Sequence, residues 1–256
     1  MLQKRAYTKP MIVAHRGASG DAPENTIAAF MLAWEQGADA IEGDFHITKD
    51  GHIVCIHDDD TARVSGSKLV ISKSTLKELQ SLDIGSHFGD QFCNERIATI
   101  EQVFATVVKG KKILVEIKCG IEILPVLIDQ IKRSSLDLSQ IIVISFNQNI
   151  IKECKIIEPK LVALWLNDFF ESNDIELIIS TLLNIGADGI SSNNNSTKEL
   201  ITKVIGLSLS YHSGWTMDNI DIIKKTINWG TQSITTNNPG KIKNELFGKK
   251  NHTRVI

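Results

Sequence analysis

The sequence predicts an α/β fold, a (β/α)₈ barrel (TIM barrel) with a small insertion after the second strand, and three observations support it. Apolar strand-like segments alternate with segments of helical periodicity, which is the pattern of βαβ units and a parallel sheet. Eight segments qualify as strands, at 11–15, 39–47, 112–117, 140–145, 161–165, 188–190, 207–211 and 232–236. The length of 256 residues suits one such barrel, so residues 1–256 are expected to form a single domain.

Local signals delimit the elements in order along the chain. Gly17 makes a loop after the first strand, and Asn25 or Thr26 is expected to cap a helix that Gly37 ends. The apolar face of this helix is predicted to be Ile27, Phe30, Met31 and Trp34. An Asp-Gly turn at 50–51 leads to a further strand at 53–56. Later helices are predicted at 99–108, 122–134, 147–157, 172–185, 196–205, 217–228 and 240–247.

Residues 58–98 break this alternation and are interpreted as the insertion. They are polar and interrupted by glycines, with one predicted helix near 74–82. Because the segment begins directly after the strand at 53–56, it is expected to cross the carboxyl-terminal mouth of the barrel. Its composition predicts few core contacts, and we expect it to shape the pocket at that mouth.

Composition limits the binding partners and the cellular compartment that are expected for this chain. A net charge of −2 gives no long-range attraction for nucleic acid, and no run of about 18 apolar residues exists, so neither nucleic-acid binding nor stable membrane insertion is expected. No apolar region follows the basic N-terminus, so no signal peptide is expected. The four cysteines form no C-x-x-C pair, which argues against structural zinc and favours a reduced, cytoplasmic protein. The composition does not decide whether the chain forms a homo-oligomer.

Two carboxylates on one strand indicate the centre of a site. Side chains on a strand alternate between its faces, so Glu42 and Asp44 point the same way from 39–47. By the same rule Glu116 and Lys118 share a face with Leu114 if the strand at 112–117 continues to residue 118. Such groups inside a barrel are costly unless they are paired or functional. The alternatives are a buried Glu–Lys or Glu–Arg pair, or a Glu42/Asp44/Glu116 ligand set for a hard cation such as Mg²⁺ or Ca²⁺.

Two histidines and two basic residues are expected near these carboxylates. His15 and His57 are candidates for general acid–base catalysis, with direct metal ligation as the alternative. Arg16 and Lys118 suit phosphate binding, and the alternative for Arg16 is a surface ion pair. The other histidines are predicted to be structural or exposed, namely His46, His52, His87, His212 and His252.

The order of these motifs resembles that of the glycerophosphodiester phosphodiesterases. H-R-G at 15–17, P-E-N-T at 23–26, E-x-D at 42–44, T-x-D-G at 48–51 and H-D at 57–58 occur in the family's order and spacing, and the resemblance continues more sparsely to about 239. It implies hydrolase activity in lipid and glycerol metabolism, the ligand set named above, and two histidines as acid and base. It also implies that Phe146 and Trp215 line the alcohol pocket, where an aromatic in the core is the alternative. Asp218 stands where the family has asparagine.

The expected reaction is metal-dependent hydrolysis of a glycerophosphodiester to glycerol 3-phosphate and an alcohol. His57 is assigned as base and His15 as acid, and the nucleophile is either the glycerol 2-hydroxyl or water. The alternatives are a related barrel phosphodiesterase acting on lysophospholipids or choline phospholipids, and a binding protein that has kept the barrel without the chemistry.

Overall fold

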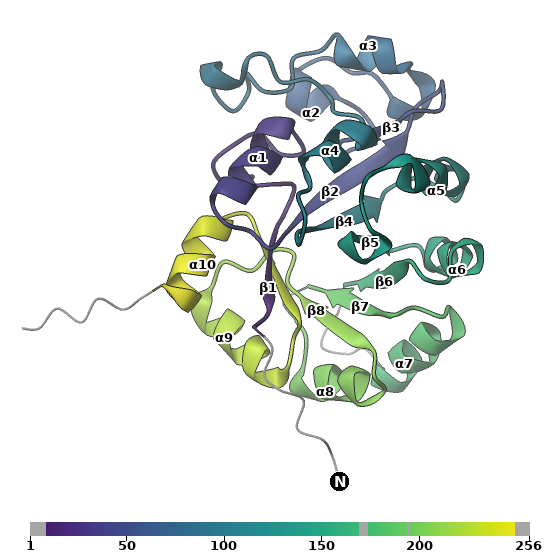
Figure 1. Ribbon diagram of the computed structural model, residues 1–256, viewed down its shortest axis with the longest axis vertical. Coiled ribbons are helices and arrows are strands. Elements are labelled where there is room, and N and C mark those ends of the chain that lie inside the picture. The colour runs from purple at the N-terminus through teal and green to yellow at the C-terminus, as the bar shows by residue number, and fades with distance from the viewer. Residues whose placement is uncertain (1–8, 169–173, 194, 249–256) are drawn as a thin grey trace, which may run out of the picture.

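The computed structural model describes residues 9–168, 174–193 and 195–248. Eight parallel strands close into a barrel because β1 pairs with both β2 and β9 (Figure 1). These strands are β1 (Met11–Ala14), β2 (Ala40–Ile47), β4 (Lys112–Ile117), β5 (Ile141–Ser145), β6 (Val162–Asn167), β7 (Gly189–Ser192), β8 (Ser210–Ser213) and β9 (Ser233–Thr236). The extra strand β3 (Ile53–Cys55) pairs antiparallel with β2. The predicted (β/α)₈ barrel is confirmed.

Helices between the strands surround the barrel (Figure 1). They are α1 (Ile27–Glu35), α4 (Ile100–Thr106), α5 (Ile123–Arg133), α6 (Gln148–Ile157), α7 (Ile175–Asn184), α8 (Lys198–Gly206), α9 (Ile220–Trp229) and α10 (Pro239–Phe247). Their bounds lie close to those predicted, although residues 172 and 173 of the predicted helix at 172–185 are outside the described residues. None of the described helices is both long enough and apolar enough to cross a bilayer.

Helix α1 shows how local signals and packing combine. Thr26 is the N-cap, since its side chain accepts a hydrogen bond from the backbone of Ala29, and Gly37 follows the helix at φ +81°. The buried face consists of Ala29, Phe30 and Ala33. The predicted placement of Met31 on that face was wrong, because its side chain is 46% exposed. Ala29, Phe30 and Ala33 are fully buried, so the buried stripe is narrower than the predicted one and Met31 lies outside it.

The barrel has an outer and an inner core, as alternation along the strands requires. Ile41 and Phe45 of β2 belong to the large outer cluster between sheet and helices. The inner cluster is smaller and contains Val13, Ala40, Leu114, Ile142, Ile144, Leu164 and Leu166. Near β7, β8 and β9 the buried side chains are instead small and polar or carry an imidazole, including Ser191, His212, Ser233 and Thr235.

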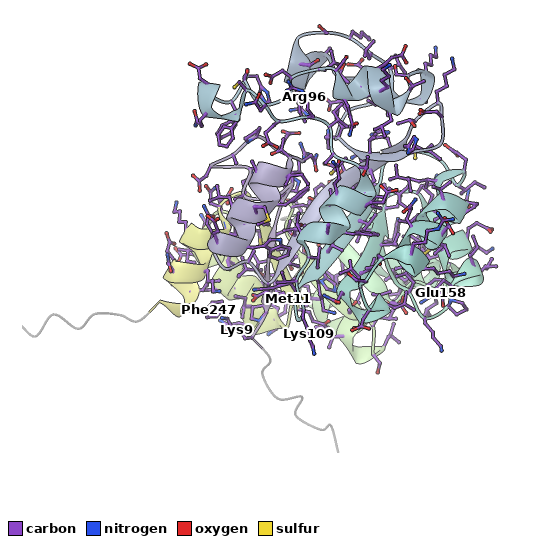
Figure 2. All side chains as sticks on the ribbon, turned by 45° about the horizontal axis from the view of Figure 1, so that its top comes forward. Lys9, Met11, Arg96, Lys109, Glu158 and Phe247 are labelled. Carbon is purple, nitrogen blue, oxygen red and sulfur yellow. The ribbon has the colours of Figure 1, made fainter. Side chains whose placement is uncertain are left out.

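The insertion is a folded unit with its own apolar cluster. It contains α2 (Ala62–Ser65), η1 (Ile71–Lys73), α3 (Leu76–Gln80) and η2 (Asp90–Phe92). Val64, Ile71, Leu79, Ile84 and Ile97 are buried together with residues 54 and 56 of the β2–β3 hairpin. The prediction of few core contacts was therefore wrong. Figure 2 shows the insertion, labelled at residue 96, on the far side of the molecule from the starts of β1 and β4.

His212 should make the protein less stable in acid. Its ring is buried with Nδ1 2.8 Å from Ser233 Oγ, and burial, followed by the charge of Lys112, lowers its pKa from 6.5 to about 4. Between these values the unfolded chain binds a proton that the folded chain does not. Stability from this group is therefore complete above pH 6.5 and falls by about 3 kcal/mol as the pH drops to about 4.

Urea unfolding between pH 7.5 and 4 would measure this loss. His212→Gln keeps a hydrogen-bonding side chain without the titration, so its stability should depend less on pH than that of the wild type. Equal pH dependence in the two proteins would contradict the assignment.

Candidate active site

A cavity of about 190 Å³ opens at the carboxyl ends of the barrel strands. All the predicted site residues except Asp44 line it. They come from within β2 and β4, from the residues directly after β1, β4, β5 and β8, and from the loop after β3. Asp44 contacts two of the lining residues, Arg16 and Lys118. The other lining residues are Leu114, Ile144, Ser191 and Thr235. No residue of the 58–98 insertion lines this cavity, so its predicted direct shaping of the pocket finds no support in the lining.

Three carboxylates converge beneath this cavity. The parallel register of β2 and β4 sets Asp44 opposite Glu116, while Glu42 lies two residues before Asp44 on the same face. Oxygen atoms of the three lie within 4.8 Å of one another. Glu42 Oε2 accepts a hydrogen bond from the Arg16 backbone amide at 2.9 Å, but the buried Oε1 has no hydrogen-bond partner among the described residues. Burial, and then the charges of Asp44 and Glu116, raise the pKa of Glu42 well above its usual value.

Arg16 and Lys118 partly balance this negative charge. Arg16 Nε lies 3.2 Å from Asp44 Oδ2, and Lys118 Nζ lies 2.9 Å from Glu116 Oε1 and 3.7 Å from Asp44 Oδ1. Burial alone would lower the pKa of Lys118, but Glu116 and Asp44 together raise it. The Glu–Lys pair considered from the sequence is thus formed. The pair does not account for all of the negative charge, because two cationic side chains face three carboxylates and one oxygen of Glu42 has no hydrogen-bond partner among the described residues.

His15 is held in one orientation by its neighbours. Its Nδ1 lies 2.8 Å from Asn237 Oδ1, and Ser19 donates to the same oxygen at 3.0 Å. Since an amide oxygen only accepts, Nδ1 carries the proton and Nε2 is the nitrogen that can exchange one. Burial, followed by the charge of Arg16, lowers the pKa of His15.

His57 is oriented in the same way by a carboxylate. Its Nδ1 lies 2.8 Å from Asp58 Oδ1, which assigns the proton to Nδ1, and its Nε2 lies 3.3 Å from Lys118 Nζ. The buried ring of His46 supports the backbone here, with Nε2 3.2 Å from the His57 carbonyl oxygen. Among the described residues the only group placed to hold a metal is the three carboxylates, so the geometry disfavours the two histidines as ligands.

Asn25 has a role at the site that the sequence interpretation missed. Its backbone is in the left-handed region at φ +58°, and its side chain donates to Asp44 Oδ2 at 2.8 Å and accepts from the Asp44 backbone amide at 3.2 Å. The buried thiol of Cys55 donates to the same amide oxygen. Thr26 takes the capping role that had been offered to either residue, which frees Asn25 to fix Asp44. The position of Asn25 in the P-E-N-T motif was the sequence feature that could have indicated this role.

The predicted aromatic residues form one wall of the cavity. Phe146 and Trp215 pack edge to face, with ring centroids 5.2 Å apart and an interplanar angle of 81°. Phe146 is 43% exposed, so it lies at the rim, and its carbonyl oxygen accepts a hydrogen bond from the Trp165 indole. The buried Nε1 of Trp215 has no hydrogen-bond partner among the described residues.

The remaining predictions concern residues away from the cavity. His52 and His87 are exposed and His212 is buried, in line with the structural or exposed assignments, whereas His252 lies outside the described residues. Asp218 does not line the cavity. Its carboxylate accepts hydrogen bonds from Thr236 and Asn238 instead.

Residues 15–241 match the model of the glycerophosphoryl diester phosphodiesterase family. The chain belongs to this family. It is 41% identical over 160 residues to a glycerophosphodiester phosphodiesterase of Caldanaerobacter subterraneus. This alignment covers 60% of this chain and 65% of the relative. It is 51% identical over 107 residues to a putative glycerophosphodiester phosphodiesterase of Bacillus subtilis, covering 42% of this chain and 44% of the relative. The matches therefore span less than two thirds of either relative.

The barrel resembles that of a phosphodiesterase of Oleispira antarctica, solved in complex with the product sn-glycerol-3-phosphate. The TM-score is 0.84 at 24% identity, over 93% of this chain and 96% of the other. At this identity the likeness concerns the fold. The family resemblance predicted from the motifs is thus confirmed, and the chemistry of this chain's own site is argued below.

Proposed function

We propose that the chain is a phosphodiesterase that hydrolyses glycerophosphodiesters to glycerol 3-phosphate and an alcohol. The observation that carries this proposal is one cavity that is lined by two histidines of assigned tautomer and lies over a carboxylate cluster, in which one oxygen of Glu42 has no hydrogen-bond partner among the described residues. Membership of the family and the names of the two relatives support the same activity. We further propose that the chain acts as one domain in the cytoplasm, without nucleic-acid or membrane partners.

Glu42, Asp44 and Glu116 are proposed to hold one divalent cation, Mg²⁺ or Ca²⁺. Their donor atoms are all oxygens within 4.8 Å of one another, which suits a hard cation. The buried Glu42 Oε1, without a partner among the described residues, offers a ligand position that Arg16 and Lys118 leave free. A bound cation would supply charge that stabilises the phosphoryl oxygens in the transition state.

Arg16 and Lys118 are proposed to bind the phosphodiester. Both line the cavity beside the carboxylates, and each side chain is about a fifth exposed, so each retains donors for a ligand. An arginine can grip two phosphate oxygens, while a lysine acts as a point charge. The alternative interpretation, that Arg16 only forms a surface ion pair, does not account for its position in the cavity lining.

His57 and His15 are proposed to transfer the protons. The His57 imidazole removes a proton from the nucleophile through Nε2, while Asp58 stabilises the imidazolium that forms. His15 donates a proton to the leaving alkoxide. Because burial and Arg16 disfavour charged His15 in the free enzyme, this role requires that the anionic substrate raise the His15 pKa when it binds.

The aromatic wall is proposed to hold the organic part of the substrate. Phe146 and Trp215 line the cavity together with Ile144 and Leu114, so the cavity presents apolar surface as well as charged groups. Such a combination suits a molecule with a phosphate at one side and carbon at the other. Hydrolysis of glycerophosphocholine with and without EDTA tests the function, and turnover that is absent with cation present would refute it.

Removal of a single carboxylate should weaken cation binding. Glu42→Gln, Asp44→Asn and Glu116→Gln each remove a charge without changing shape, so each should lower turnover by about 10²-fold or more. Calorimetric titration with Mg²⁺ and Ca²⁺ measures the loss of affinity. Glu101→Gln changes an exposed carboxylate on α4 and should behave as wild type. Unaltered cation affinity in all three variants would refute the ligand set.

Removal of either histidine should impair chemistry and spare the metal. His15→Ala and His57→Ala should each lower kcat by roughly 10²–10⁴-fold, the usual range for general acid–base groups. Cation affinity should be unchanged in both, and His87→Ala, at an exposed histidine, should retain full activity. A histidine variant that loses the cation would show that this residue is a ligand.

The leaving group distinguishes acid from base. In a glycerophosphodiester of p-nitrophenol, the leaving group is p-nitrophenolate, which departs without protonation. The general acid is then dispensable, while the general base is not. His15→Ala should then recover most of its activity on this ester relative to glycerophosphocholine, and His57→Ala should not. The opposite pattern would reverse the two roles. A 2-deoxyglycerol ester would separate attack by the 2-hydroxyl, which it lacks, from attack by water.

A further inference from the structure

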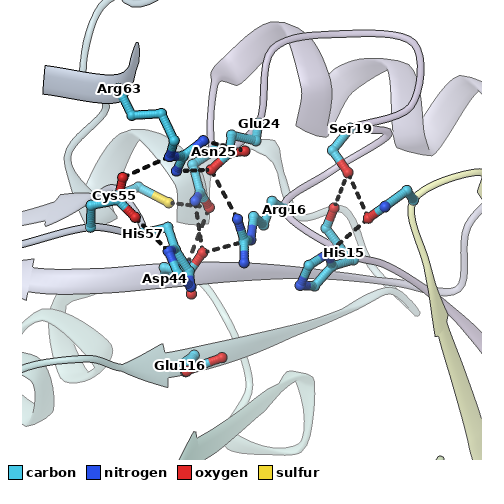
Figure 3. Close-up of polar contacts among 12 residues, drawn as sticks. His15, Arg16, Ser19, Glu24, Asn25, Asp44, Cys55, His57, Arg63 and Glu116 are labelled. Carbon is cyan, nitrogen blue, oxygen red and sulfur yellow. Dashed lines mark hydrogen bonds and ion pairs between the residues drawn. The ribbon is translucent and has the colours of Figure 1, made fainter. Parts of the chain in front are cut away.

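The insertion delivers one cationic side chain, Arg63 of α2, to the rim of the site. Its Nε donates to Asp58 Oδ2 at 2.7 Å, and its two terminal nitrogens donate to the two oxygens of Glu24 at 3.0 and 2.8 Å (Figure 3). All three of these contacts are charge-assisted, and the pair with Glu24 is bidentate, the geometry that gives arginine its directional strength.

Each carboxylate that Arg63 holds also contacts a residue of the cavity. Asp58 Oδ1 accepts from His57 Nδ1 at 2.8 Å, and Glu24 Oε1 accepts from Arg16 at 3.0 Å. The contacts therefore form one chain of alternating charge, with Arg63 at its centre. One arm ends on the imidazole of His57, and the other ends on the guanidinium of Arg16 (Figure 3).

We propose that Arg63 is a positioning residue that fixes the orientations of His57 and Arg16 relative to each other. The inference rests on the proposed function, because it gives Arg63 a purpose only if those two residues act on one substrate. Arg63 itself does not line the cavity and touches neither the imidazole nor the proposed ligands.

Electrostatics explains why the two arms depend on Arg63. Partial burial raises the pKa of Asp58, but the hydrogen bonds from Arg63 and His57 outweigh it and bring the pKa to about 2. For Glu24, burial again raises the pKa and the two arginines lower it. Without Arg63, Asp58 loses its second anchor and can turn away from His57. Glu24 is left with Arg16 alone, which would then be drawn from Asp44.

A purely structural role, tethering the insertion to the barrel, is the competing explanation. The insertion has an independent anchor, since Val64, Ile71 and Leu79 are buried with residues of the β2–β3 hairpin. Arg63 is also 46% exposed, so its ion pairs are partly screened and contribute little to overall stability. Its removal should therefore leave the insertion folded.

The test compares Arg63→Ala with Arg96→Ala in the metal-loaded enzyme. Arg96 is the matched control, because it belongs to the same insertion and donates to the backbone carbonyls of Cys93 and Glu95, away from the site. With glycerophosphocholine, Arg63→Ala should lower kcat by about 10–100-fold and raise KM, whereas Arg96→Ala should change neither. Unfolding temperature and Mg²⁺ affinity should be alike in the two variants.

Arg63→Lys should recover only part of kcat, because an ammonium group lacks the fork that spans both carboxylates. Combined with Asp58→Asn, Arg63→Ala should cost less than in the wild-type background, since the arm to His57 is already broken. Additive losses, full rescue by lysine, or an Arg63→Ala kcat within twofold of wild type would overturn the proposal. If Arg63→Ala fails to fold, Arg63→Lys still decides, measured alone and in a cycle with Asp58→Asn.

A spectroscopic measurement separates this inference from the proposed function. The ¹⁵N signals of the His57 imidazole report which nitrogen is protonated, whether or not the protein turns over glycerophosphocholine. Arg63→Ala should reduce the Nδ1–H form relative to the wild type and to Arg96→Ala, and an unchanged tautomer would refute the positioning role. Wild-type protein without turnover, but with a tautomer that depends on Arg63, would refute the function alone.

Discussion

An excess of buried negative charge at the carboxyl end of the barrel is the constraint on which the surrounding structure depends. Alternation along β2 sends Glu42 and Asp44 inward, and the register with β4 adds Glu116. Carboxylates so close in a poorly solvated space remain charged only if donors and cations face them. Arg16, Lys118 and Asn25 meet this need in part, and the oxygen of Glu42 that has no partner among the described residues is the remainder that a cation would satisfy.

Two loop residues reach the carboxylates through backbone conformations that are normally disfavoured. Arg16 and Asn25 both have positive φ, at 54° and 58°. In this conformation the Arg16 amide meets Glu42 and the Asn25 side chain forms a reciprocal pair with Asp44. Such strain persists where other interactions over-determine the conformation, and here charge-assisted hydrogen bonds provide them. The loop after β1 is therefore organised by the charge of the next strand.

The insertion illustrates a division between folding and function. Its apolar cluster includes Val54 and Ile56, so it folds onto the β2–β3 hairpin and not over the cavity. It meets the site through polar contacts at Asp58 and Arg63. Packing thus places the unit, while charge connects it to the histidine and the arginine of the cavity. In the proposed function, this arrangement would let the insertion affect catalysis without lining the pocket.

The sequence alone determined the barrel and named most of the residues that line the candidate cavity, because both follow from short-range rules. Strand and helix periodicity predicted the eight units, and alternation placed Glu42 with Asp44 and Glu116 with Lys118. The motif order predicted the family. These inferences need only the spacing of residues along one strand or one motif.

What required the tertiary structure is every contact between distant segments. Polar composition suggested a loosely packed insertion, since scattered apolar residues such as Ile71 and Ile97 show no common face until the chain folds. Met31 was misplaced because helical spacing does not say how wide the buried stripe is. The link from His57 through Arg63 to Arg16 joins two separate segments, the loop after β1 and the stretch from His57 into α2. No local pattern encodes it, because its geometry depends on where the barrel brings those segments together.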